Sequence, residues 1–263
     1  NDPLILNYPR LNRSIIMSAF LIFGATGSVG SRLARRLVKN DCNVVLAGRD
    51  SEKLAAISSE LGCPSATVDA SDARSFVRCF EETIGTFGQI AGVANCIGSL
   101  LLKPAHRTTD DEFQATLTTN LFSAFATVRA AGQMMNRNGG SVVLVSSAAA
   151  RIGMPNHEAI AAAKAGIEGL TISAAASYAA RGIRFNAVAP GLTKSNMTRH
   201  LWENTTAAEA STRMHALGRL GEPEDVAAMI HWLLSNETSW VTGQVFAVDG
   251  GLSSVLGRPK VSR

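Results

Sequence analysis

The chain contains 263 residues, 46% of them hydrophobic, which is enough to bury a full core. Its 25 lysines and arginines against 21 aspartates and glutamates give a net charge of +4, and because the basic residues are scattered, this excess does not indicate a nucleic-acid-binding protein. The four cysteines show neither CxxC pairing nor histidine partners at metal-ligand spacing, so we expect no metal site and a reduced, cytoplasmic protein.

The first apolar run, residues 15–23, superficially resembles a signal peptide. It is too short to span a membrane and runs into a glycine turn without a small-residue cleavage site, so we interpret it as the first core strand and expect no membrane association. Met17 stands just before that strand. We therefore predict an N-terminal extension at residues 1–16 and a single domain at residues 17–263.

Short apolar runs alternate with amphipathic segments of ten or more residues along the rest of the chain. The runs interpreted as buried strands are 20–23, 43–47, 66–68, 90–94, 141–145, 184–188 and 244–248. Continuous apolar strands separated by helices are typical of a parallel sheet that is covered on both faces. The fold class predicted is α/β: a Rossmann-type, doubly wound, seven-stranded parallel sheet whose ligands bind beyond the carboxyl ends of the strands.

A glycine-rich turn directly follows the first predicted strand. It reads Gly24-Ala25-Thr26-Gly27-Ser28-Val29-Gly30 and opens a helix. Glycines allow the backbone to turn sharply and approach a pyrophosphate, which then meets the free N–H groups of the helix N-terminus. Because a strand precedes the turn and a helix follows it, the motif predicts a dinucleotide site rather than a tight turn without a ligand. Arg32, Arg35, Arg36 and Lys39 share one face of that helix and are interpreted as its solvated surface.

The end of the second predicted strand bears on the choice of cofactor. A carboxylate there would bond the ribose hydroxyls of NAD, whereas this chain has Gly48 followed by Arg49. A guanidinium can pair with a 2′-phosphate, so we expect NADP(H) to be preferred over NAD(H). Asp50 is adjacent and surface arginines are common, which leaves NAD(H) as the alternative.

Further motifs occur in the same order along the chain: Asp69, Asn95-Cys96-Ile97-Gly98, Asn120, Ser147, Lys164, Pro190-Gly191, Gly243-Gln244 and Asp249-Gly250-Gly251. Together with the glycine turn, over residues 18–252, they resemble the short-chain dehydrogenase/reductase family. The resemblance is greatest to its β-ketoacyl-thioester reductases and its sugar or steroid alcohol members. It implies an oxidoreductase that transfers hydride between a nicotinamide and a carbonyl or secondary alcohol.

The resemblance also implies roles for individual residues. Asp69 would hold the adenine and Asn95 would form the edge of the adenosine pocket. The nicotinamide end would be held by Pro190, Gly191, Thr193 and Ser195. Ser147 would donate a hydrogen bond to the substrate oxygen, and Lys164 would bond the ribose and lower the pKa of the proton donor. Asn120 would bind the water that links Lys164 to solvent.

The chain departs from the family pattern where the proton donor is expected. The family's Tyr-x-x-x-Lys motif places a tyrosine four residues before the lysine, and that position is Ile160, which also lies thirteen residues after Ser147. Isoleucine cannot transfer a proton, so we expect an atypical donor. His157, three residues earlier, is the candidate, because a histidine changes its charge near neutral pH. The alternatives are water, an acidic group of the substrate, or a histidine that merely begins the helix.

Two classes of function remain open. The first is an NADP(H)-preferring enzyme acting on a small-molecule carbonyl or alcohol, with a lid at about residues 192–217. The second is a catalytically weak or inactive NADP(H)-binding sensor or partner subunit. A serine hydrolase is disfavoured because no Gly-x-Ser-x-Gly motif surrounds Ser146 and Ser147. The alanine-rich stretch 159–180 predicts close helix packing, and we expect a homotetramer or homodimer.

Overall fold

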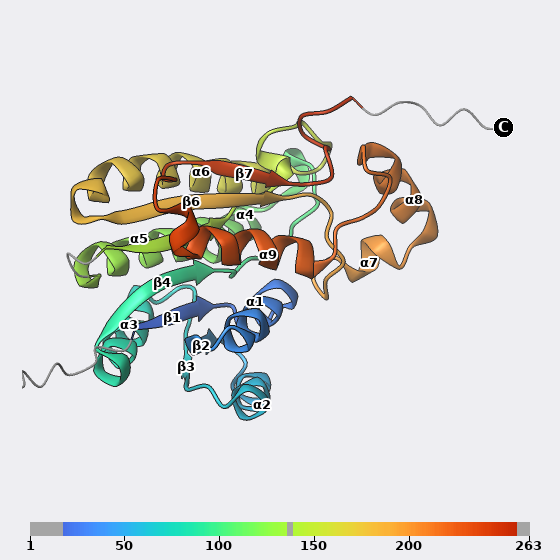
Figure 1. Cartoon of the computed structure of the whole chain (residues 1–263). Coiled ribbons are helices and arrows are strands. Elements are labelled where there is room, and N and C mark those ends of the chain that lie inside the picture. The colour runs from blue at the N-terminus through green and yellow to red at the C-terminus, as the bar shows by residue number, and fades with distance from the viewer. Residues whose placement is uncertain (1–17, 136–138, 257–263) are drawn as a thin grey trace, which may run out of the picture.

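A parallel sheet of seven strands forms the centre of the molecule, and helices cover both of its faces (Figure 1). The computed structural model describes residues 18–135 and 139–256. The predicted N-terminal extension, residues 1–16, lies outside these described residues. The sheet confirms the predicted fold class.

The strands follow the order β3-β2-β1-β4-β5-β6-β7 in the sheet. Their bounds are β1 Ser18–Phe23, β2 Asn43–Gly48, β3 Ser65–Thr67, β4 Gln89–Asn95, β5 Gly140–Val145, β6 Ile183–Pro190 and β7 Val245–Val248. All seven lie where the apolar runs predicted them, with ends that differ by one to two residues. The register pairs Ala47, Phe23, Asn95 and Leu144 across four neighbouring strands, so the carboxyl ends of β2, β1, β4 and β5 meet at one edge.

Alternate residues of each strand face opposite layers of helices, as the two-residue period of a strand requires. In β1, Leu21 and Phe23 pack into a core with Phe76 of α3, whereas Ile22 packs into a second core with Leu33 of α1. The helices are α1 Ser28–Lys39, α2 Ser51–Leu61, α3 Ala73–Phe87, α4 Asp110–Leu117, α5 Ser123–Met134, α6 Glu158–Tyr178, α7 Arg199–Trp202, α8 Thr205–Met214 and α9 Pro223–Leu234. Helices α1, α2 and α9 cover one face of the sheet, and α3, α5 and α6 cover the other.

Helix α6 is apolar enough to resemble a membrane span by composition. Within the described ranges, Glu158–Arg181 is the one stretch that passes such a test, with a mean hydropathy of 1.2. It packs against β6, and Ile167 and Thr171 on its inner face are buried. Its apolar character therefore reflects its place as a core helix.

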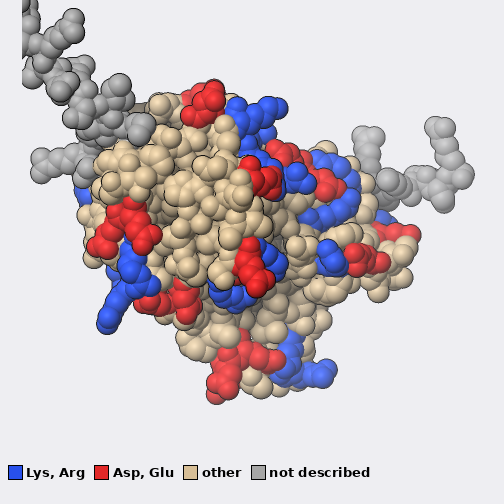
Figure 2. All heavy atoms as spheres, turned by 90° about the horizontal axis from the view of Figure 1, so that it is seen from below, with Lys and Arg blue, Asp and Glu red and all other residues tan. Residues whose placement is uncertain are grey.

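The charged side chains are distributed in mixed sign. On the face shown in Figure 2, blue and red residues are interspersed among uncharged surface. On α1, Arg35 pairs with Glu60 at 2.7 Å and Arg36 pairs with Glu224 at 3.2 Å. Such exposed pairs contribute little stability, and they support the interpretation of this helix face as solvated surface.

Candidate active site

A cavity of about 600 Å³ opens at the edge where the strand ends meet. Its walls come from the glycine turn after β1, the start of α2, the segments after β4, β5 and β6, and the first two turns of α6. In doubly wound sheets this edge is where ligands bind, because the loops there diverge and leave a crevice. The cavity is the candidate active site.

The glycine turn has the close approaches that a phosphate loop needs. Gly24 has a φ of +75°, and a Cβ there would lie 2.8 Å from the Cys96 carbonyl carbon. A Cβ on Gly30 would lie 2.3 Å from the Gly24 oxygen. Helix α1 begins at Ser28 without an acidic residue in its first turn, so its free N–H groups face the cavity uncompensated. The turn therefore fits a pyrophosphate.

The β2 end of the cavity carries charge. Arg49, Asp50 and Lys53 all line it. The Asp50 carboxylate accepts a hydrogen bond from the Lys53 backbone N–H at 3.1 Å and pairs with the Lys53 ammonium at 2.7 Å, so it is used in starting α2. Asp69 lies outside the cavity lining, and its carboxylate accepts hydrogen bonds from the N–H and hydroxyl of Ser71, which hold its pKa below the ordinary range.

Ser147 and Lys164 come together at the middle of the cavity. Ser147 follows β5 and accepts a hydrogen bond from the Ala149 backbone at 3.2 Å, while Lys164 reaches over from α6. The Lys164 Nζ donates to the Val145 carbonyl at 2.8 Å, and the residue is 6% exposed. Burial lowers the pKa of the ammonium to about 8. The lysine thus places an exchangeable proton beside the cavity near physiological pH.

Asn120 lies in a π-helical turn, Thr118–Phe122, between α4 and α5. Its Nδ2 donates to the Thr116 carbonyl and to the Ser99 hydroxyl, both at 2.9 Å, and its Oδ1 accepts from the Ser99 N–H at 3.2 Å. Gly98 brings Asn120 and Lys164 near each other, since a Cβ there would be 3.2 Å from Asn120 Oδ1 and 3.6 Å from Lys164 Nζ. Such extra-residue turns recur at functional sites.

Ile160 and His157 both face the cavity from the start of α6. Ile160 lies one helical turn before Lys164 and is 3% exposed. His157 is the N-cap residue of α6, and its Nδ1 lies 2.8 Å from the Pro155 carbonyl oxygen. A carbonyl only accepts, so Nδ1 carries the hydrogen, and Nε2 remains for exchange with a ligand. The half-buried histidine side chain thus lines the cavity and also remains accessible to solvent.

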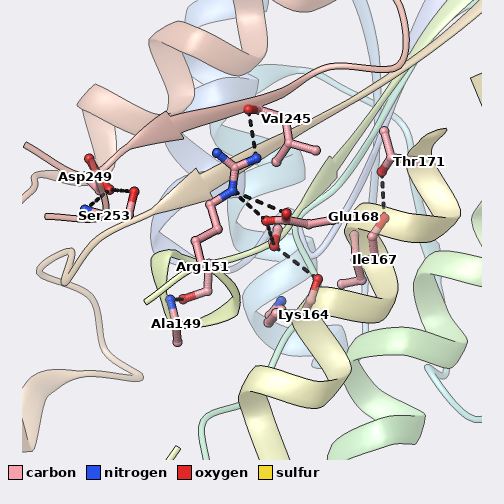
Figure 3. A network of polar contacts seen from close by, with 11 residues as sticks. Ala149, Arg151, Lys164, Ile167, Glu168, Thr171, Val245, Asp249 and Ser253 are labelled. Atoms are coloured by element: carbon pink, nitrogen blue, oxygen red, sulfur yellow. Dashed lines mark hydrogen bonds and ion pairs between the residues drawn. The ribbon is translucent and has the colours of Figure 1, made fainter. Parts of the chain in front are cut away.

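A polar network supports the loop that carries Ser147. The Ser146 hydroxyl, 2.9 Å from Glu168 Oε1 on α6, donates to that carboxylate, and Glu168 also accepts from Arg151 Nε at 3.0 Å. Arg151 then donates to the Val245 carbonyl at 3.1 Å (Figure 3). One carboxylate thereby ties the loop after β5 to α6 and, through Arg151, to β7.

The segment after β6 closes the cavity on the other side. Pro190, Gly191, Thr193 and Ser195 line it. Gly191 has no room for a side chain, because a Cβ would lie 2.6 Å from Nε2 of the buried His215. Asn196 then contacts the glycine turn directly, its N–H donating to the Ser28 hydroxyl at 3.3 Å.

Most of the predicted site residues meet in this cavity. Those that line it are Thr26, Gly27, Ser28, Val29, Gly30, Arg49, Ser147, His157, Lys164, Pro190, Gly191, Thr193 and Ser195. Gly24, Asp69, Asn95 and Asn120 do not. Asn95 is 3% exposed, and it bonds the Thr127 hydroxyl and the Ile97 N–H at 2.9 Å each, so it shapes the turn after β4 from inside the core.

Sequence reasoning missed three contributors. Lys53 lies four residues after Arg49, and a second cation at that spacing could have indicated a site for an anionic group. Glu168 lies one turn after Lys164 on the same helix face, and this spacing could also have been recognised in the sequence. His215 lies 24 residues beyond Gly191, and no local pattern connects the two.

Known proteins share this architecture. A family model described as Enoyl-(Acyl carrier protein) reductase matches residues 24–253. The chain is 33% identical over 241 residues to the 3-oxoacyl-[acyl-carrier-protein] reductase FabG of Rickettsia bellii, covering 89% of this chain and 96% of that protein. A solved short-chain type dehydrogenase/reductase from Mycobacterium ulcerans superposes with a TM-score of 0.87 at 28% identity, covering 91% of each chain. A solved structure of ElxO with NADP bound gives a TM-score of 0.85 at 26% identity, covering 91% of this chain and 100% of that one.

A doubly wound sheet with a glycine turn, a serine and a buried lysine at its carboxyl edge defines a nucleotide-dependent oxidoreductase. The chain belongs to the short-chain dehydrogenase/reductase family, and its activity class is that of an NAD(P)-dependent oxidoreductase. The resemblance seen in the sequence is thereby confirmed at the level of the family.

Proposed function

We propose that the protein is an NADP(H)-preferring oxidoreductase that interconverts a small-molecule carbonyl compound and its secondary alcohol, with an atypical proton donor. The observation that carries this proposal is the continuity of one cavity from the glycine turn to Ser147 and Lys164. Bound nicotinamide would supply or accept the hydride. The chain's own residues must bind and orient both reactants and move the proton.

The β2 end of the cavity supports the preference for NADP(H). Arg49 and Lys53 place two cations there, and the one carboxylate beside them, Asp50, is already bonded to the start of α2. A 2′-phosphate would meet positive charge, whereas the ribose hydroxyls of NAD would lack a free carboxylate acceptor. The resemblance assigns Asp69 and Asn95 to the binding of the adenosine. Neither lines the cavity, so each would contribute to adenosine binding from a position behind the lining residues.

At the reacting end, the Ser147 hydroxyl would donate a hydrogen bond to the carbonyl oxygen and stabilise the charge that develops on it. The Lys164 ammonium would bond the ribose and add positive charge beside that oxygen. Asn120 would order water at Gly98, where its amide and Lys164 approach each other. These three residues polarise and orient the substrate, and a proton source is still required.

His157 is the proposed proton source. With Nδ1 donating to Pro155, a protonated ring would present Nε2–H to the cavity. Reduction would then transfer that proton to the alkoxide oxygen, giving the alcohol and a neutral imidazole that is reprotonated from solvent. Oxidation of the alcohol would run in reverse. A positioned donor of this kind contributes roughly 10²–10⁴-fold to rate.

Ile160 favours a second candidate function. It occupies the place one turn before Lys164 from which the resemblance implies a tyrosine acid, and its side chain has no group that can transfer a proton. On this alternative the protein binds NADP(H) but has little or no redox activity, and acts as a sensor or partner subunit. The retained Ser147 favours the enzyme, because a simple binder does not use it.

The decisive experiment compares NADPH oxidation by the wild type, His157→Gln and Ile160→Tyr across a panel of ketones, after NADPH and NADH dissociation constants are measured for each. We expect wild-type turnover, at least a tenfold loss in His157→Gln, and tighter binding of NADPH than NADH that Arg49→Ser abolishes. Turnover by Ile160→Tyr alone, with the wild type silent but binding NADPH, would instead establish the binding role.

The proposal also covers the setting in which the protein acts. We propose a single cytoplasmic domain over residues 17–263, consistent with free thiols at all four cysteines. Residues 192–217 would form the lid, since α7 and α8 lie over the cavity mouth and Leu201 and Met214 line it. We further propose a homotetramer or homodimer.

A further inference from the structure

We infer that the substrate is an uncharged, apolar ketone or secondary alcohol, and that Ile160 is a residue that contacts its hydrocarbon part. This inference rests on the proposed function, since it concerns the same cavity. The observation behind it is that apolar side chains line one end of the cavity, whereas charged side chains are concentrated at the other end.

The end of the cavity away from the glycine turn is lined by hydrocarbon and thioether groups. They come from the loop after β4, the segment before α6, the start of α6, the lid and the segment after β7. These residues are Leu100, Leu102, Met154, Ile160, Met197, Leu201, Met214 and Leu252. Walls of this kind, contributed by separate segments, are typical of sites for apolar small molecules.

Charge is concentrated at the other end. Among the described residues that line the cavity, the aspartate, glutamate, lysine and arginine side chains are Arg49, Asp50, Lys53 and Lys164. The first three follow β2, which is separated from β5 by β1 and β4, so they lie about 14 Å along the sheet from Ser147. A substrate whose carbonyl lies at Ser147 is therefore beyond direct contact with them.

In the proposed function Lys164 is occupied by the ribose of the cofactor, so it would not serve as an anchor for a substrate anion. Its ammonium donates to the Val145 carbonyl at 2.8 Å, and burial leaves 6% of the residue exposed. Nearby, Arg151 and Glu168 pair with each other behind Ser146. A carboxylate or sulfonate buried against the leucines and methionines would lose its hydration and find as polar neighbours only the proton donor His157 and neutral hydroxyls such as that of Ser211, which is unfavourable.

Ile160 extends this apolar wall to the reacting centre. It lies one turn before Lys164, faces the cavity and presents only methyl and methylene groups there. Met197 and Met214, on the lid, are 46% and 52% exposed, so apolar surface remains to be covered by a ligand. Methionine side chains adapt to irregular shapes, which suits a ring or branched alkyl substituent.

The test uses two ketones of similar size, 4-isopropylcyclohexanone and 4-oxocyclohexanecarboxylate, and the corresponding alcohols. Reduction with NADPH gives kcat/KM for each ketone, and calorimetry gives the affinity of each alcohol for the protein holding NADPH, a complex that cannot react. We expect the neutral compound to be favoured at least tenfold in both measurements. Leu102→Arg, which places a cation in the apolar end, should reverse the preference, whereas Leu256→Arg, at a residue that is 98% exposed and outside the lining, should leave it unchanged.

The contact with Ile160 is tested by Ile160→Val. Removing one methylene should raise the KM for 4-isopropylcyclohexanone severalfold and leave NADPH affinity unchanged. Preference for the neutral alcohol in calorimetry without any turnover would uphold the inference while overturning the proposed oxidoreductase activity. Equal or better binding of the carboxylate, or no binding of either alcohol by a protein that binds NADPH, would overturn the inference.

Discussion

At the scale of one residue, Lys164 is a functional group whose burial lowers the stability of the folded protein. The amine is held among α6, β5 and the turn after β4, with the Val145 carbonyl as its partner. Burial lowers the pKa of the ammonium to about 8, against about 10.4 for an exposed lysine. This difference corresponds to a destabilisation on the order of 3 kcal/mol while the lysine is charged.

The sign of the pH dependence follows from that shift. Below pH 8 the lysine is charged in both folded and unfolded chains, so the full cost is present. Between about pH 8 and 10.4 the folded protein binds fewer protons than the unfolded chain, and its contribution to stability improves as pH rises. We predict that Lys164→Met unfolds at higher urea than the wild type below pH 8, and that this difference disappears near pH 10.

The comparison with the variant is needed because buried thiols act in the opposite sense. Burial raises the pKa of the Cys79 and Cys96 thiols to about 12, so both favour the folded protein less as pH rises above their ordinary range. The effect of Cys79 cancels in the difference, but the Lys164 charge lowers the pKa of Cys96, so wild type and variant are compared in a Cys96→Ala background. An unchanged difference between pH 7 and pH 10 would contradict the assignment of a depressed pKa to Lys164.

Which residues gather at one edge of the sheet could be predicted from the sequence. The glycine turn and Ser147 follow β1 and β5, whose carboxyl ends share that edge, and Lys164 lines the same cavity from α6. The surroundings of Asn95 were not predictable, because whether an amide faces a crevice or the core depends on its partner Thr127, 32 residues away. Asp69 likewise turns to a neighbour, Ser71, two residues on.

At the scale of elements, the Glu168 carboxylate on α6 connects its helix to the loop after β5 and, through Arg151, to β7. It bonds Ser146 after β5 and pairs with Arg151, which bonds β7, while its own helix carries Lys164 (Figure 3). The pair is partly shielded, with Glu168 side-chain exposure of 19%, so the bonds are screened less than surface pairs. Glu168 is therefore a positioning residue for Ser147 and Lys164.

We predict that Glu168→Gln lowers kcat for ketone reduction three- to tenfold, with KM and the NADPH dissociation constant changed less than twofold. The amide keeps the size of the side chain but loses the charge that holds Arg151. Glu168→Asp should recover part of the loss. Glu60→Gln, which removes the exposed pair with Arg35, serves as the matched control and should leave kcat unaltered. A fall in NADPH affinity that matches the fall in kcat would show general destabilisation instead.

Strand positions were predicted to within two residues at each end. The edge strands β3 and β7 differ from their predicted ends by at most one residue, and the largest differences are at the start of β1 and the end of β6, where the backbone pairing continues beyond the apolar run. The π-helical turn around Asn120 was not foreseen. One additional residue in a helix leaves the apolar periodicity nearly intact, so its position is decided by tertiary contacts such as those with Ser99.

At the scale of the whole molecule, an apolar hollow on the outer side of α4, α5 and α6 is where we expect a second copy to bind. Its lining comprises Gln114, Leu117, Thr118, Leu121, Phe122, Phe125 and Leu170. Phe125, within this lining, is 44% exposed. Contiguous apolar surface of this kind marks association sites.

We predict that the wild type sediments as a dimer or tetramer and that Phe125→Asp shifts it to the monomer, because association would bury a carboxylate without a partner in this hollow. Analytical ultracentrifugation measures the change. Leu256→Asp introduces the same charge at an exposed leucine away from this hollow and should keep the wild-type mass. A monomeric wild type at micromolar concentration would refute the prediction.

The contact between Asn196 and Ser28 couples the binding of a ligand at one end of the cavity to the binding of a ligand at the other end. The Ser28 hydroxyl accepts the Asn196 N–H from the lid segment, although it also belongs to the turn that fits a pyrophosphate. A hydroxyl can donate to a phosphate oxygen while it accepts the Asn196 N–H, so a bound phosphate would strengthen its hold on the lid. Affinities at the two ends of the cavity are then linked, and by reciprocity a ligand that closes the lid alters the affinity for the nucleotide by the same factor.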